Sequence, residues 1–95
     1  MGFAQALLLS GANAVVLSLW KVDDTATALL MGRFYENLTG AYQDPRAGRV
    51  AEPLTKAEAL QEAKRWLRTY TDREGRHPFA HPVYWSAFVL IGDPD

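Results

Sequence analysis

The chain has 95 residues, a formal net charge of -1 and a sequence pI of about 6.1. This length holds one small domain or part of a larger one, and 48% hydrophobic with 22% charged residues is typical of a folded chain. The Lys and Arg residues are scattered, so we expect neither a nucleic-acid partner nor binding to a membrane surface. The absence of cysteine excludes disulfides, thiolate metal sites and a cysteine nucleophile from these residues.

The N-terminal segment resembles a signal peptide only in part. An apolar stretch precedes the small-residue pattern ANA at residues 12–14, but the first charge of either sign is Lys21, so the positive region of a signal peptide is missing. Polar residues also interrupt the one apolar run that approaches the length of a membrane span. We therefore expect a soluble, cytoplasmic protein.

The first two predicted elements are a buried helix and a buried strand. Residues 2–10 are apolar almost throughout, and Gly11 suits the left-handed position after a helix end. Residues 14–20 (AVVLSLW) are apolar and rich in β-branched side chains without alternation, which is typical of a strand covered by helices on both faces. Together these segments predict a parallel α/β sheet.

A helix over residues 24–39 is predicted next. Gly40 follows its end. Its apolar positions recur at helical spacing: Ala26, Leu29, Leu30, Phe34, Tyr35 and Leu38. Residues 41–54 contain two prolines and a glycine among charged residues, so they predict a mobile surface loop.

A second, amphipathic helix follows from about residue 56 to 70. Thr55 and Glu58 form the sequence pattern of a capping box at its start. After a polar segment over residues 71–82, residues 84–91 predict another buried strand. Because each element reverses the chain direction, this strand is predicted to run antiparallel to the one at residues 14–20. Two strands cannot cover their own faces and edges, so the sequence predicts part of a larger sheet domain, truncated on its N-terminal side.

Several residues could carry catalytic chemistry, but none lies in a recognised pattern. Ser10, Ser18 and Ser86 are outside any Gly-x-Ser-x-Gly motif. His77 and His81 each precede a proline, which disfavours the helical geometry that two metal ligands four residues apart would need. No glycine-rich phosphate loop is present, so neither a metal nor a nucleotide cofactor is expected.

The remaining candidate is the segment at residues 18–24 (SLWKVDD), where a buried strand gives way to a helix. In open α/β sheets, ligands bind at this edge. In one interpretation Asp23 or Asp24 caps the helix and Trp20 fills space beneath it. In the other, the second acid is available for a ligand, because one cap needs only one carboxylate.

Five segments of the sequence together form a recognisable pattern: residues 2–12 (GFAQALLLSGA), 15–24 (VVLSLWKVDD), 34–38 (FYENL), 56–60 (KAEAL) and 81–94 (HPVYWSAFVLIGDP). In these segments the chain closely resembles the C-terminal part of CHAT domains, which are caspase-like cysteine peptidase modules commonly found beside tetratricopeptide repeats in bacterial proteins. The resemblance implies an α/β fold, the C-terminal half of a caspase-hemoglobinase-like sheet domain with helices on both faces.

In that family the catalytic His and Cys precede the matched segment, so the resemblance assigns no catalytic residue to this chain. It implies a peptide or protein substrate, and as partners the N-terminal half of the domain and tetratricopeptide repeats. By analogy with related caspase-like peptidases, Trp20, Asp23 and Asp24 would bind substrate near the pocket for the residue before the cut bond and favour a basic side chain. A non-catalytic scaffold module in a repeat-containing signalling protein, or a gene fragment without function, are the alternatives.

Two consequences follow for the isolated chain. Without a cysteine it should have no peptidase activity. An incomplete sheet should also leave apolar surface exposed and promote self-association, through Leu7, Leu8, Val15, Val16 and Leu17.

Overall fold

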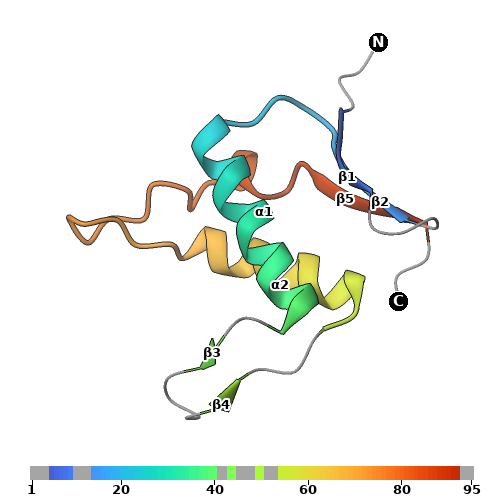
Figure 1. The fold of residues 1–95 in the computed structure, drawn as a ribbon. Coiled ribbons are helices and arrows are strands. Elements are labelled where there is room, and N and C mark those ends of the chain that lie inside the picture. Colours follow the sequence, from blue (N-terminus) through green and yellow to red (C-terminus); the bar gives the residue numbers. More distant parts are fainter. Residues whose placement is uncertain (1–4, 10–13, 41–42, 45–48, 51–53, 93–95) are drawn as a thin grey trace.

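The structure, a computed structural model, describes residues 5–9, 14–40, 43–44, 49–50 and 54–92 (Figure 1). It has an α/β fold in which two helices, α1 (Asp24–Thr39) and α2 (Lys56–Arg68), lie side by side next to a three-stranded sheet. The strands are β1 (Gln5–Leu9), β2 (Ala14–Ser18) and β5 (Phe88–Gly92), in the order β1-β2-β5. The predicted α/β class is therefore confirmed.

The central strand β2 is antiparallel to both of its neighbours. It pairs with β1 through Leu9 and Val15, with an irregular register between Ala6 and Leu8. Its pairing with β5 confirms the predicted antiparallel arrangement of these two strands. The parallel sheet expected from the sequence is wrong for the described strands.

The helix predicted over residues 2–10 is also wrong, because residues 5–9 form β1; residues 2–4 and 10 lie outside the described part. A short apolar run has no periodicity that separates a buried helix from a buried strand. Pairing with the next strand along the chain then decides the conformation, as tertiary context commonly does for marginal propensities.

The two faces of the sheet have different surroundings. Val16 is fully buried in the core and Leu90, its partner across the β2–β5 pair, packs against that core. On the opposite face, Val15 is half-buried and its partner Ile91 is exposed. Helices α1 and α2 therefore cover one face of the sheet, and among the described residues no helix covers the other.

Helix α1 has the predicted bounds, and local chemistry sets both ends. The Asp23 carboxylate accepts a hydrogen bond from the Ala26 backbone N–H at 3.1 Å, and Gly40 ends the helix in the left-handed conformation with φ 73°. The buried side chains of the helix recur at steps of three and four: Ala26, Leu30, Phe34 and Asn37.

Helix α2 begins with the predicted capping box, in which the hydroxyl of Thr55 and the carboxylate of Glu58 each accept from the other residue's backbone N–H. The helix ends at Arg68, two residues before the predicted end. Contacts between Asn37 and Ala59, and between Arg33 and Glu62, run in opposite chain directions, so α1 and α2 are antiparallel.

The core lies between the helices and the covered face of the sheet. Its largest fully buried side chains come from α1, α2, β2 and β5: Phe34, Phe88, Leu30, Leu67 and Val16. The expected exposure of Val16 is therefore wrong, since α1 and α2 provide its partners. Val15 and Leu17 remain half-buried, and the side chains of Leu7 and Leu8 lie outside the described part, so self-association stays a prediction.

The connecting segments differ from the sequence expectation in two places. Within residues 41–54, the short strands β3 (Gln43–Asp44) and β4 (Arg49–Val50) pair antiparallel. Before β5, a short 3-10 helix, η1 (Pro82–Tyr84), occupies part of the predicted strand, so that strand begins at Phe88. Proline at the first position of η1 and the His81 ring, which accepts from the Val83 N–H, favour the helical turn there.

No helix within the described ranges is both long enough and apolar enough to cross a membrane.

Candidate functional site

The segment between β2 and α1, residues 19–23, is fixed at both ends and in its middle. The Ser18 hydroxyl donates to the backbone carbonyl of Trp20, and the Trp20 indole N–H donates to the carbonyl of Val83 at 3.1 Å. Val22 is buried in the core. These contacts tie the turn to the segment before β5, which lies more than sixty residues later in the sequence.

The two neighbouring acids have different positions. Asp23 is the N-cap of α1, as described above. The side chain of Asp24 is 98% exposed, and its nearest cation is the exposed Lys21 ammonium at 3.9 Å. One acid therefore caps the helix, and the carboxylate of the other points into solvent.

Partly exposed apolar side chains occur in the same turn and in the segment that it contacts through the Trp20–Val83 hydrogen bond. Leu19, Trp20 and Val83 are 42%, 37% and 43% exposed, respectively. An aromatic ring, aliphatic surface and an exposed carboxylate together suit a ligand with an apolar stem and a positive end, such as an Arg or Lys side chain. We name Trp20, Asp24 and Val83, with Leu19 and Lys21 beside them, the β2–α1 surface.

Among the described residues no serine hydroxyl contacts an imidazole; the Thr71 hydroxyl lies 3.5 Å from His77 Nδ1 and donates to the Thr69 carbonyl at 3.2 Å. The hydroxyls of Ser18 and Ser86 donate to backbone carbonyls, and Ser10 lies outside the described part. His81 caps η1, and the His77 Nδ1 atom lies 3.2 Å from the carbonyl oxygen of Thr69. No cluster of three or more potential metal ligands occurs in the part of the chain that the structure describes.

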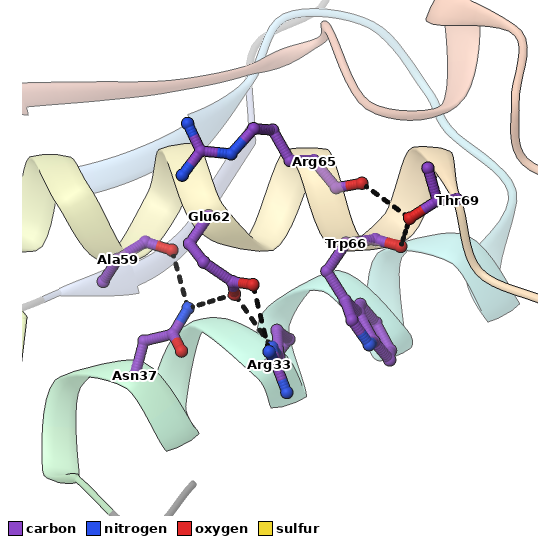
Figure 2. A network of polar contacts seen from close by, with 7 residues as sticks. All are labelled: Arg33, Asn37, Ala59, Glu62, Arg65, Trp66 and Thr69. Atoms are coloured by element: carbon purple, nitrogen blue, oxygen red, sulfur yellow. Dashed lines mark hydrogen bonds and ion pairs between the residues drawn. The ribbon is translucent and has the colours of Figure 1, made fainter. Parts of the chain in front are cut away.

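A second polar cluster joins the two helices (Figure 2). The Arg33 guanidinium donates twice to the Glu62 carboxylate, at 2.8 and 3.0 Å. The Asn37 amide nitrogen donates to the same carboxylate at 2.8 Å and to the backbone carbonyl of Ala59 at 3.0 Å. We name Arg33, Asn37 and Glu62 the interhelical cluster.

The interhelical cluster is electrostatically balanced. Burial raises the pKa of Glu62, but the hydrogen bonds from Arg33 and Asn37, together with the charges of Arg33 and Arg65, lower it by more, and the net shift is downward. The Arg33 guanidinium also lies over the Trp66 ring, 5.5 Å from its centroid. These contacts orient the helices, and no free nucleophile or base remains among them.

Sequence reasoning missed the interhelical cluster, because its residues come from two helices that are separated in sequence. One local signal existed: Asn37 stands one residue before Leu38 and three after Phe34, within the apolar stripe of α1. A polar residue in a buried stripe needs partners from a neighbouring element.

The opposite side of α2 forms a pocket of about 400 Å³ together with β5 and the residues before it. Its lining is Ala57, Leu60, Gln61, Lys64, Arg65, Arg68, Trp85 and Leu90. No residue of the β2–α1 surface contributes to this pocket, so the two surfaces are separate.

Comparison with known protein families shows which family the chain belongs to. The family model of the CHAT domain matches residues 1–93. The chain belongs to the CHAT domain family. The match covers nearly the whole sequence, including both surfaces described above. It supports a general relationship of the chain to the caspase-like peptidase family.

A curated relative of this CHAT chain is the human protein "Tetratricopeptide repeat protein 28", which is 28% identical over 92 residues. The alignment covers 97% of this chain and 3% of the relative. No solved structure matches the chain.

Proposed function

We propose that the chain is the C-terminal half of a CHAT module acting as a caspase-like cysteine endopeptidase. The catalytic His and Cys are supplied by residues that precede this segment in a longer polypeptide. The thiolate would attack the peptide carbonyl and form an acyl-enzyme as the C–N bond breaks, the His would give its proton to the leaving amine, and water would then hydrolyse the acyl-enzyme. The present chain would provide one wall of the substrate site.

The observation that carries the proposal is that Asp23 caps helix α1 while the neighbouring Asp24 does not. Asp23 satisfies the helix cap, so Asp24 is not needed for that purpose, and its side chain is exposed in the same turn as the partly exposed Trp20. On the β2–α1 surface, Asp24 would pair with a basic side chain before the cut bond while Trp20 packs against its aliphatic stem. The absence of cysteine from this chain is the reason for assigning the nucleophile elsewhere.

The activity is tested with the longer polypeptide that contains this chain, using fluorogenic peptides that end in Arg, Lys or Ala. We expect turnover that a thiol-alkylating reagent abolishes, and no turnover from residues 1–95 alone. Turnover by residues 1–95 that survives further purification and a metal chelator would contradict the proposal and direct attention to the serine hydroxyls.

The substrate site is tested with two substitutions in the active polypeptide. Asp24→Asn should lower kcat/KM for Arg and Lys substrates at least about tenfold and leave the Ala substrate nearly unchanged, because a charge partner of the substrate is lost. Asp23→Ala is the matched control: it removes the cap and should lower stability without changing the ratio of basic to neutral cleavage. Equal ratios in both variants would mean that the acids act only on the helix.

A scaffold role in a repeat-containing protein is the second candidate, and the name of the human relative records tetratricopeptide repeats. In this version the CHAT fold binds partner proteins without cleaving them. A longer polypeptide that lacks the His and Cys pair, and shows no thiol-dependent turnover, would support the scaffold and exclude the peptidase.

The same proposal includes the partners and the location. The N-terminal half of the domain would pack beside the described sheet, tetratricopeptide repeats would lie in the same polypeptide, and the module would work in the cytoplasm on peptide or protein substrates.

A further inference from the structure

The pocket between α2 and β5 combines an apolar floor with a positive rim. Leu60 and Leu90 contribute aliphatic surface, and Trp85 contributes an aromatic wall. At about 400 Å³ the pocket has room for a bulky side chain together with part of the backbone that carries it.

All charged residues that line the pocket are cations: Lys64, Arg65 and Arg68. Burial lowers the pKa of the Lys64 ammonium. The Arg68 guanidinium lies over the Trp85 ring, 5.8 Å from its centroid, so the aromatic wall also orients a cation. No carboxylate of the lining offsets these charges.

The three cations lie together on the side of α2 that faces away from α1. Figure 2 shows the Arg65 side chain on the side of α2 away from α1, whereas the Glu62 carboxylate points toward Arg33. Lys64 is half-buried beside apolar residues of another element. Arg65 and Arg68 are exposed at the rim, so only the half-buried Lys64 is partly removed from water, where a cation attracts an anionic group more strongly than in bulk solvent.

The sheet leaves this side accessible among the described residues. β5 is an edge strand in the order β1-β2-β5, and Leu90 on it faces both the core and the pocket. A segment lying along the pocket would therefore meet α2 on one side and the edge of the sheet on the other.

We propose that this pocket binds an acidic peptide segment of a partner protein, which inserts one bulky apolar side chain between Leu60, Trp85 and Leu90. Flanking Glu or Asp side chains pair with Lys64, Arg65 and Arg68. Charge complementarity selects the acidic segment, and the apolar floor selects against ions that carry no hydrophobic group. The site is separate from the β2–α1 surface, so it stands independently of the proposed peptidase activity.

Fluorescence anisotropy tests the proposal with the purified chain and a short fluorescein-labelled peptide of Glu and Ser residues around a central Leu. Binding should weaken as salt increases. Arg68→Glu should weaken it at least about tenfold, because a favourable charge pair becomes a repulsive one. Arg73→Glu, an exposed substitution outside the pocket with the same change in net charge, should alter affinity by less than about twofold. A peptide in which Ser replaces the Leu should bind several-fold more weakly.

The indole N–H signals of the three tryptophans provide a second measurement on the unaltered chain, so a variant that fails to fold does not decide the outcome. In ¹⁵N-labelled protein the peptide should shift the Trp85 signal and leave the Trp20 and Trp66 signals in place. No binding to the unaltered chain, an unshifted Trp85 signal, or equal weakening by Arg68→Glu and Arg73→Glu overturns the proposal. So does tighter binding of an oligonucleotide of equal charge, or a dimer of the chain that Arg68→Glu dissociates.

Discussion

The two sides of α2 place charged residues in opposite circumstances. Toward α1, Glu62 accepts hydrogen bonds from Arg33 and Asn37, and the charges are paired within the fold. Toward β5, Lys64 and Arg68 line a pocket that contains no carboxylate. A single amphipathic helix thus uses one polar side to hold its neighbour and presents the other to the surroundings.

This difference separates stability from recognition. Paired, partly buried charges stabilise an arrangement because removing one partner leaves the other desolvated. Unpaired cations beside an apolar cavity contribute little to folding but remain available to a ligand. Substitutions on the two sides of α2 should therefore have different readouts.

The largest expected effect is on the α1 side. Glu62→Ala leaves Arg33 and Asn37 without their shared acceptor and should lower the free energy of unfolding by about 2–3 kcal/mol, or Tm by about 10–20 °C in a domain of this size. Lys64→Ala, on the other side of the same helix, should change stability by less than about 0.5 kcal/mol. Urea denaturation of both variants measures the difference. Equal losses would erase the distinction between the two sides.

A smaller effect should separate the neighbouring acids of the β2–α1 surface in the same way. Asp23→Ala removes the carboxylate that accepts from the Ala26 N–H and should cost about 1 kcal/mol of stability. Asp24→Ala removes only an exposed charge near the helix start and should cost less than about 0.5 kcal/mol. Thermal melts of the two variants make this comparison, and a reversed order would mean that Asp24 is the functional cap.

The smallest effect is a pH dependence. Because the folded-state pKa of Glu62 lies below its ordinary value of 4.5, the ionised form stabilises the fold at higher pH, and this contribution is lost as pH falls from about 4.5 through the folded-state value. Backbone hydrogen bonding from Arg76 lowers the pKa of Asp72 and adds a loss in the same direction. Urea midpoints between pH 7 and pH 3 should therefore fall, and less steeply in Glu62→Gln. An identical slope in that variant would contradict the role of the carboxylate.

Local patterns predicted the helices because their determinants are close in sequence. The cap at Asp23, the glycine at residue 40 and the pair Thr55 and Glu58 are each contained within a few residues of a helix end. The strand at residues 5–9 was mistaken for a helix because its conformation depends on pairing with β2, which no local period records.

The site was predictable only in part, for the same reason. The turn at residues 18–24 could be found because it follows a buried strand, but the assignment of the cap to Asp23 needed the geometry at Ala26. The contact between Trp20 and Val83, the interhelical cluster and the α2–β5 pocket all join segments that are distant in sequence. A single sequence does not identify the partners in such pairs; at most it marks one member, as Asn37 in the apolar stripe of α1 does.

The central functional claim is that Asp24 selects substrates with a basic side chain before the cut bond. Its most direct test is Asp24→Lys in the active longer polypeptide, with kcat/KM measured for matched peptides carrying Arg or Glu before the cut bond. We expect the preference to move from Arg toward Glu by at least about a hundredfold in the ratio, since an attractive pair becomes repulsive and a repulsive one attractive. An unchanged ratio in a variant with normal stability would contradict the account.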